Sequence, residues 1–202
     1  MAAMSGSNHD FDAIYEVGTP AWDIGRPQPA FDYLAAAGRL VGRVLDVGCG
    51  TGEHALLAAS IGHDAVGIDM SARAIELAKV KATERDLEAL FVVADALRLV
   101  DLGDQFDTVL DCGLFHVLDD LERERYVESL ADVVVPDGRV HVLCFSDRQP
   151  GDWGPRRVTC DELRLAFATG WEIESIEPAT IDLTWDPAGA LAWLMAATRK
   201  RS

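Results

Sequence analysis

The sequence predicts an α/β fold with a mainly parallel sheet, and three observations support this prediction. From Arg43 onward, short apolar runs alternate with stretches of helical spacing. The first run, Val44–Val47, ends in a cluster of glycines. After Phe145 the alternation stops, and a loop rich in Pro, Gly and Trp follows. Alternating strands and helices indicate right-handed crossovers and a parallel sheet covered on both faces.

The alternating part gives the first set of elements. The expected strands are Val44–Val47, Ala65–Asp69, Leu90–Val93, Phe106–Leu110 and Val140–Phe145. The expected helices are Glu53–Ile61, Ala72 to about Leu87, and Leu121–Val135. Ser71 is placed to cap the second of these helices. The turn signal Pro136, Asp137 and Gly138 is expected to end the third.

The C-terminal part is predicted to add a helix and two strands. Thr159 and Glu162 have the spacing of a capping box, so a helix is expected from there to about Thr169. Trp171–Ile176 and Leu191–Thr198 have the character of strands, with a connection of about 15 residues between them. Such a pair can close the edge of the sheet as a hairpin.

The N-terminal part does not share this rhythm. We expect residues 1–40 to comprise a polar tail, Met1–Asp12, and a lid segment, Phe11–Leu40, with residues 41–202 forming one domain. The lid segment holds Tyr15, Trp22 and Arg26 among prolines and ends in a helix-like stretch. Aromatic and Arg side chains next to prolines indicate a rigid segment that covers a cleft.

Composition excludes some classes of partner. The chain has 202 residues and a formal net charge of −16, which disfavours nucleic acids and anionic membranes. No apolar run approaches the roughly 18 residues that span a membrane, and the N-terminus lacks the features of a secretory signal. The four cysteines form no C-x-x-C pair, which predicts free thiols and a cytoplasmic location.

The strongest chemical signal is the strand, glycine loop and helix around Gly48, Gly50 and Gly52. Glycines at the carboxyl end of a parallel strand let a ligand approach the backbone. Dinucleotide enzymes use such a loop in the pattern G-x-G-x-x-G, with pyrophosphate at the helix N-terminus. Here Glu53 occupies the third glycine position, and its carboxylate would repel a pyrophosphate.

S-adenosylmethionine suits the loop better, because it is cationic and carries no phosphate. Acidic residues around the loop then favour binding, and Asp46 precedes the glycines. Asp69 ends the second strand, where a carboxylate can accept hydrogen bonds from both ribose hydroxyls. Asp95 follows the third strand and is placed to accept the exocyclic amine of adenine.

The segment Asp46–Gly52 resembles the first motif of class I S-adenosylmethionine-dependent methyltransferases. Asp69, the pair Asp95 and Ala96, and Asp111–His116 match the later motifs in order and spacing. The resemblance implies a Rossmann-like seven-stranded sheet, mostly parallel with one antiparallel strand and with helices on both faces. The cofactor-binding residues that it implies are Asp46, Gly48, Cys49, Gly50, Gly52, Asp69, Met70, Asp95, Ala96 and Asp111.

The stretch Thr19–Pro27 resembles the N-terminal segment of the thiopurine, halide and thiol methyltransferases and of tellurite-resistance-type relatives. It is also similar to that of actinobacterial methyltransferases acting on heterocycles and phenols. In these groups the segment folds over the cofactor, with the tryptophan near the methyl donor. The resemblance therefore adds Trp22 and Arg26 to the cofactor site, although both could instead only pack the segment onto the core.

The acceptor side has several candidates. His116 is either a packed histidine or a general base, and Tyr15 is the second candidate for catalysis. The predicted substrate-binding residues are Tyr15, Trp22, Phe115, His116 and Trp153, the last of which could also only rim the pocket. No cluster of carboxylates and histidines indicates a metal site.

These observations predict in-line transfer of a methyl group from S-adenosylmethionine, with S-adenosylhomocysteine as product. The expected acceptor is O, N or S of a small, aromatic or heterocyclic molecule, and a base is needed only where the acceptor must lose a proton. Two alternatives remain open: an NAD(P)-dependent oxidoreductase, and a non-catalytic cofactor-binding protein on the same scaffold. Neither the acceptor nor the oligomeric state can be read from the chain.

Overall fold

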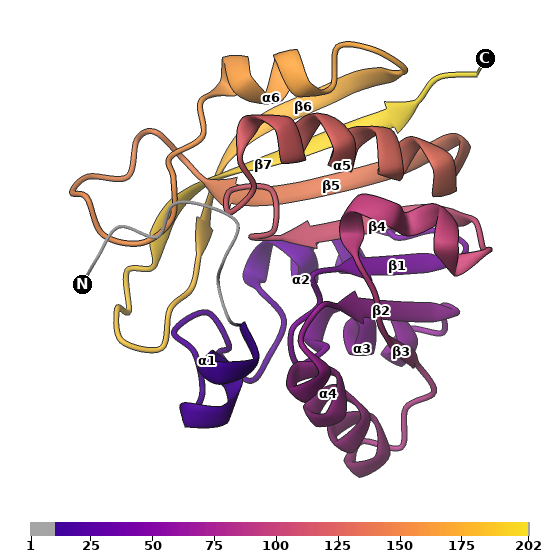
Figure 1. The fold of residues 1–202 in the computed structure, drawn as a ribbon, viewed down its shortest axis with the longest axis vertical. Coiled ribbons are helices and arrows are strands. Elements are labelled where there is room, and N and C mark those ends of the chain that lie inside the picture. The colour runs from indigo at the N-terminus through magenta and orange to yellow at the C-terminus, as the bar shows by residue number, and fades with distance from the viewer. Residues whose placement is uncertain (1–10, 202) are drawn as a thin grey trace.

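A computed structural model describes residues 11–201, which form a seven-stranded sheet (Figure 1). The strands are β1 Val44–Val47, β2 Ala65–Asp69, β3 Leu90–Val93, β4 Phe106–Cys112, β5 Val134–Phe145, β6 Trp171–Ile181 and β7 Ala190–Arg199. Their order is β3-β2-β1-β4-β5-β7-β6. Strands β1 to β5 pair in parallel, whereas β7 is antiparallel to both β5 and β6. The predicted Rossmann-like sheet with one antiparallel strand is confirmed.

Helices cover both faces of the sheet, as predicted. They are α1 Phe11–Val17, α2 Pro29–Ala36, α3 Glu53–Ser60, α4 Ala72–Glu84, the 3₁₀ helix η1 Ala96–Leu102, α5 Asp120–Val133 and α6 Cys160–Ala166. Successive strand residues point to opposite faces, so β1 contributes to two cores. Leu45 and Val47 pack with η1, α5 and α6, whereas Val44 packs with α2, α3 and α4.

The two predicted helix caps are confirmed. The Ser71 side chain accepts a hydrogen bond from the Ala74 N–H at the start of α4. Thr159 and Glu162 form a reciprocal capping box at the start of α6. Each cap satisfies backbone N–H groups that have no partner within the helix, so the local sequence fixes where both helices begin.

The C-terminal hairpin differs from the prediction in length. Strand β6 continues to Ile181 and β7 begins at Ala190, so the connection is residues 182–189 and is shorter than expected. Pro178 lies within β6, which is the edge strand of the sheet. An edge strand tolerates proline because one side of its backbone needs no partner, which explains why the strand does not stop there.

The predicted turn at Pro136, Asp137 and Gly138 is wrong. Strand β5 begins at Val134, directly after α5, and its register with β4 shifts between Phe106 and Thr108. Asp137, with φ of 65°, lies in the bulge that this shift produces. The signal therefore marks a bulge inside a strand and not a turn between two elements.

Helix α1 within the lid segment was not predicted. It lies beside the start of α4, where the Asp12 carboxylate accepts hydrogen bonds from the Ser71 hydroxyl at 2.5 Å and the Arg73 N–H at 3.1 Å. In Figure 1, α1 and the β6–β7 loop both lie beyond the carboxyl ends of the parallel strands. Most of the predicted polar tail, residues 1–10, lies outside the described residues.

Candidate active site

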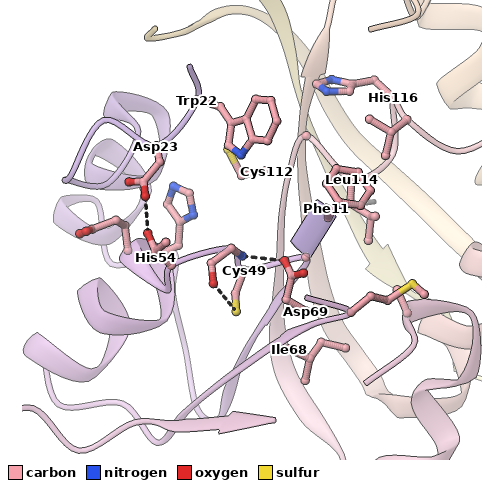
Figure 2. Close-up of a pocket in the computed structure, with 18 of the residues that line it drawn as sticks. Phe11, Trp22, Asp23, Cys49, His54, Ile68, Asp69, Cys112, Leu114 and His116 are labelled. Carbon is pink, nitrogen blue, oxygen red and sulfur yellow. Dashed lines mark hydrogen bonds between the residues drawn. The ribbon is translucent and has the colours of Figure 1, made fainter. Parts of the chain in front are cut away.

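A cavity of about 260 Å³ opens at the carboxyl ends of the parallel strands. Its walls come from the glycine loop after β1, the ends of β2 and β3, the loop after β4, the lid segment and the end of β6. Figure 2 shows His116 and Leu114 across the cavity from Asp23 and His54. This is the edge at which open α/β sheets bind ligands.

The glycine loop follows β1 and forms the floor of the cavity. Gly48 and Gly50 line it, with φ of 67° and 53°. A Cβ at Gly50 would lie 2.6 Å from the Tyr15 hydroxyl. Gly52 does not line the cavity, because it faces Phe91 and Ala78, where a Cβ would lie 2.6 Å from the Phe91 ring. The first two glycines therefore leave room for a ligand, and the third allows α3 to pack closely.

Asp69 stands at the end of β2 and lines the cavity together with Met70. One carboxylate oxygen accepts the Gly50 N–H and the other accepts the Ser71 N–H, both at 2.8 Å. Burial raises the pKa of Asp69, and these backbone hydrogen bonds oppose the shift. A carboxylate has about four acceptor positions, so this one can still accept from a ligand's hydroxyls.

Asp95 and Ala96 line the cavity beyond the end of β3. Asp95 is the N-cap of η1, and one of its oxygens accepts the Leu97 N–H at 2.9 Å. This contact fixes the carboxylate at the cavity wall. Asp95, Asp69 and Asp23 together make the part of the cavity that they line acidic.

Asp46 and Asp111 do not reach the cavity wall. Asp46 is fully buried below the glycine loop and accepts the Ala55 N–H, and burial raises its pKa to about 8. Asp111 is also fully buried and accepts the N–H groups of Leu114 and Phe115, and burial raises its pKa to about 7. Both acids hold the backbone of cavity-lining loops in place.

Two aromatic residues of the lid segment cover the glycine loop. The buried Tyr15 hydroxyl accepts a hydrogen bond from Trp22 Nε1 at 3.3 Å, and both side chains line the cavity. Burial raises the pKa of Tyr15, so its hydroxyl keeps its proton at neutral pH. Tyr15 is therefore a hydrogen-bond donor over the loop and a poor general base.

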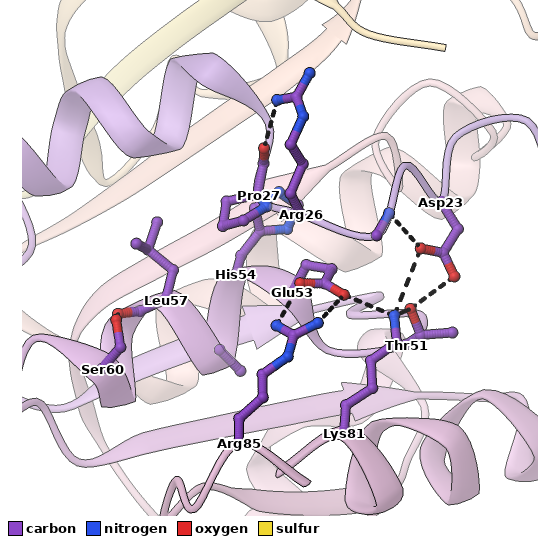
Figure 3. Close-up of polar contacts among 12 residues, drawn as sticks. Asp23, Arg26, Pro27, Thr51, Glu53, His54, Leu57, Ser60, Lys81 and Arg85 are labelled. Carbon is purple, nitrogen blue, oxygen red and sulfur yellow. Dashed lines mark hydrogen bonds and ion pairs between the residues drawn. The ribbon is translucent and has the colours of Figure 1, made fainter. Parts of the chain in front are cut away.

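A polar cluster joins the lid segment to the glycine loop and α4 (Figure 3). The Thr51 hydroxyl donates to Asp23 at 2.8 Å and accepts from Lys81 Nζ at 2.6 Å. Lys81 also donates to Glu53 at 2.7 Å, and Arg85 binds both oxygens of that carboxylate. Lys81 and Arg85 thus compensate the charge of Glu53, so the prediction that its carboxylate would repel a pyrophosphate is wrong.

The lid segment is also bound to the end of β6. The Gln28 amide exchanges two hydrogen bonds with the Asp182 backbone, at 2.7 and 3.1 Å, and Arg26 pairs with the Asp182 carboxylate at 2.6 Å. The Gln28 N–H donates to Nε2 of His54, a lining residue that the sequence did not predict. Arg26 lines the cavity as well.

His116 lies on the opposite wall, in the loop after β4. Its Nδ1 accepts the Phe145 N–H at 3.0 Å. Burial, with the nearby Arg123 and Arg157, lowers its pKa to about 3, so the ring is neutral. A neutral ring whose Nδ1 accepts carries its proton on Nε2, which makes His116 a donor and not a free base.

Two predicted substrate-binding residues are not on the cavity wall. Phe115 is fully buried and packs against Phe167, because the loop after β4 turns it into the core. Trp153 packs edge-on against Phe145 and Trp185, behind the wall that Phe145 forms. The substrate-binding candidates that do line the cavity are Tyr15, Trp22 and His116.

Residues 11–201 contain no group of three or more His, Cys, Asp or Glu side chains arranged to hold a metal ion. Within the same residues, no helix is both long and apolar enough to cross a membrane.

Comparison with known proteins identifies the class of enzyme. Residues 44–138 match the family described as "Methyltransferase domain". The chain is 38% identical over 165 residues to a 2-heptyl-1-hydroxyquinolin-4(1H)-one methyltransferase of Mycobacteroides abscessus, covering 80% of this chain and 73% of that protein. It is 26% identical to a probable thiol methyltransferase 2 of Arabidopsis thaliana, covering 84% of this chain and 76% of that one.

Solved structures agree with this result. One, from work on "Conversion of a Disulfide Bond into a Thioacetal Group during Echinomycin Biosynthesis", superposes with a TM-score of 0.87 at 38% identity, covering 94% of this chain and 91% of that one. TehB from Haemophilus influenzae shares the fold, with a TM-score of 0.68 at 18% identity, and the match covers 84% of this chain and 62% of that one. The chain belongs to the S-adenosylmethionine-dependent methyltransferases, and S-adenosylmethionine is its cofactor.

Proposed function

We propose that this enzyme transfers a methyl group from S-adenosylmethionine to a heteroatom of a small aromatic or heterocyclic acceptor. The main support is the division of one cavity into an acidic half and an apolar half. The acidic half holds Asp23, Asp69 and Asp95. The apolar half is lined by Leu114, Val117, Leu118, Phe145, Ile181 and Leu183. The first half suits a cationic nucleoside, and the second suits an apolar ring.

In this proposal the acidic half binds the cofactor. Asp69 accepts the ribose hydroxyls, Asp95 faces the adenine, and Gly48 to Gly50 hold the methionine part. Asp46 and Asp111 act through the loops that they support. Trp22, which lines the cavity, would offer its aromatic face to the sulfonium, because aromatic faces attract cations. The acidic lining favours this cofactor over NAD(P), whose pyrophosphate is anionic.

The protein's contribution to the reaction is alignment. The cofactor supplies a methyl group that is already activated by the positive charge on sulfur. The lid segment and the β6–β7 loop exclude water, and the apolar half aims the acceptor at the methyl group. Such alignment can lower a barrier by roughly 7–11 kcal/mol.

Relatives support a heterocyclic acceptor. The relative from Mycobacteroides abscessus is named for a hydroxyquinolone, which is a flat bicyclic heterocycle. Leu114 and Phe145 offer apolar walls of the kind that a flat ring packs against. We also propose a cytoplasmic location, because all four cysteines are free thiols.

Calorimetry and a transfer assay test this function together. S-adenosylhomocysteine is expected to bind at one site, and labelled methyl is expected to move from the cofactor to an N-hydroxyquinolone. Binding without transfer to any member of an acceptor panel would favour a non-catalytic role. Absence of binding would refute the proposal.

A further inference from the structure

We propose that the acceptor binds as an anion, as the ionised hydroxyl of a heteroaromatic ring, and that His116 donates a hydrogen bond to it. No side chain of the cavity then removes a proton during methyl transfer. This inference rests on the proposed function and specifies its acceptor.

The ring of His116 is oriented so that it can donate a hydrogen bond into the cavity. Because Nδ1 accepts the Phe145 N–H at 3.0 Å, the remaining ring nitrogen carries the proton. Nε2 has no hydrogen-bond partner among residues 11–201, and the ring lines the cavity. The ring packs edge-on against Phe145, with the centroids 5.0 Å apart, which holds its plane. Nε2–H of His116 is therefore a fixed donor that faces the apolar half of the cavity, where the acceptor is proposed to bind.

Outside the three aspartates of the acidic half, three other potential bases line the cavity, and each already holds a hydrogen bond or an ion pair. Glu122 closes the capping box of α5, where it accepts the Asp119 N–H at 2.9 Å. Glu53 is held by Lys81 and Arg85. His54 accepts the Gln28 N–H on Nε2. An acceptor that needs deprotonation during the reaction would find no free base on the apolar walls.

The charges behind the apolar walls favour an anion. The Arg157 guanidinium lies 5.4 Å from the centre of the Phe145 ring. It donates only to the backbone carbonyls of Gln149, Gly151, Trp153 and Pro155. None of the salt bridges formed within residues 11–201 involves Arg157, and Asp152 acts on it only through its field. Arg157 thus places a positive charge that forms no ion pair within residues 11–201 behind Phe145, a residue of the cavity wall.

Arg123 adds a second guanidinium behind the same half. It is buried at 4% exposure, donates from Nε to the Phe115 carbonyl at 3.0 Å, and lies 4.6 Å from the centre of the Phe115 ring. Glu162 pairs with it at 3.2 Å and compensates part of its charge. Arg123 of α5 and Arg157 of the loop before α6 act electrostatically on His116. Glu122 of α5 lines the same cavity, Arg123 also acts on the buried carboxyl of Asp111 of β4, and Glu162 of α6 pairs with Arg123.

The reaction balances without a catalytic base. The acceptor loses its proton to water before it binds. An oxygen lone pair then forms the bond to the methyl carbon while the carbon–sulfur bond breaks, and that electron pair stays on sulfur. A cation and an anion become two neutral products. Loss of both charges weakens the electrostatic hold on each product.

A spectroscopic titration tests the charge of the bound acceptor directly. The probe is para-nitrophenol, whose anion is yellow, added to the protein saturated with S-adenosylhomocysteine. We expect its acid dissociation constant to rise about tenfold on binding, because two guanidinium groups favour the anion. Arg157→Gln should reduce this increase severalfold, whereas Arg164→Gln on the exposed face of α6 should not change it. Failure of the probe to bind, or binding as the neutral phenol, overturns the inference.

A rate measurement tests the role of His116. Across ring-substituted N-hydroxyquinolones, the midpoint of the pH dependence of kcat/KM should follow the pKa of each acceptor. His116→Gln, which keeps an N–H donor, should lower kcat/KM by about tenfold or less and leave that midpoint in place. A general base would instead account for a loss of about 10²–10⁴-fold and a changed profile. The inference is contradicted if His116→Gln causes such a loss and the midpoint of the pH dependence does not change with the pKa of the acceptor.

The two proposals fail differently. Suppose that S-adenosylhomocysteine binds and a neutral thioether is methylated, but para-nitrophenol does not bind. Then only the proposal of an anionic acceptor is wrong. If S-adenosylhomocysteine does not bind, the proposed function is wrong.

Discussion

The two halves of the cavity differ in charge and in how they are built. The acidic half, where the methyl donor is proposed to bind, is the donor half. It consists of backbone turns and of acidic side chains at strand ends, such as Asp69. The apolar half, where the acceptor is proposed to bind, is the acceptor half. It consists of apolar side chains with Arg123 and Arg157 behind them. The donor half therefore suits a cation and the acceptor half suits an anion. In the proposed reaction, one cavity brings two opposite charges together and releases them as neutral products.

The largest effect is expected at Asp69, which defines the donor half. Asp69→Ala removes the proposed ribose acceptor and leaves the Gly50 N–H without its partner. Hydrogen bonds to charged groups contribute about 1.5–3 kcal/mol, so the Kd for S-adenosylhomocysteine should rise roughly 10–100-fold. Calorimetry measures this change. Asp101→Ala, which removes an exposed acid, is the matched control, and unchanged affinity in Asp69→Ala means that the ribose assignment is wrong.

Gly50→Ala should have the next largest effect. Its φ of 53° is strained for alanine by about 1–2 kcal/mol, and the new Cβ would lie 2.6 Å from the Tyr15 hydroxyl. We expect about tenfold weaker binding of S-adenosylhomocysteine. Tyr15→Phe in the same chain removes the clash and should restore part of the affinity. If the double variant binds no better than Gly50→Ala, Tyr15 does not lie over the loop.

Lys81→Met tests the link between the lid segment and the donor half. It removes the cation that joins Thr51 and Glu53 and stands 3.6 Å from Asp23, and no part of it touches the acceptor half. Partly buried ion pairs of this kind contribute on the order of 1 kcal/mol, so S-adenosylhomocysteine should dissociate about fivefold faster. Stopped-flow release measures this rate. Lys79→Met on the same helix is the control, and an equal effect from it would contradict the link.

The smallest effect concerns pH and Asp46. Burial raises its pKa from 3.8 to about 8, so the folded protein holds this proton more tightly than the unfolded chain. The contribution of this proton to the free energy of unfolding is complete below pH 3.8. It is lost as the pH rises toward about 8. Asp46→Asn cannot ionise, so the fall in Tm between pH 5 and 8 should shrink by a few degrees. Thermal melts at both pH values measure it, and an undiminished fall would show that Asp46 does not carry the dependence.

The donor half could be predicted from the sequence because its signals are local. Gly48, Gly50 and Asp69 stand at strand ends, and a strand end followed by glycine or an acid is readable from neighbouring residues. The positions of strands β1 to β4 and the caps of α4 and α6 follow from the same local patterns. The division into residues 1–40 and 41–202, and the role of each site residue, stay predictions.

The acceptor half and the lid contacts could not be predicted in the same way. Gln28 meets Asp182, and Asp23 meets Thr51, across long stretches of chain that no periodic pattern links. The loop after β4 is irregular, so nothing in the sequence shows that Phe115 turns inward while His116 lines the cavity. The tautomer of His116 depends on a backbone N–H of β5, which only the folded chain brings to it.

A crystal structure with S-adenosylhomocysteine and an N-hydroxyquinolone tests the central claim most directly. We expect the cofactor's ribose at Asp69, its sulfur beside the glycine loop, and the acceptor's oxygen within hydrogen-bond distance of His116 Nε2. An acceptor whose oxygen points away from His116, or that sits outside the cavity against Trp185, would contradict it.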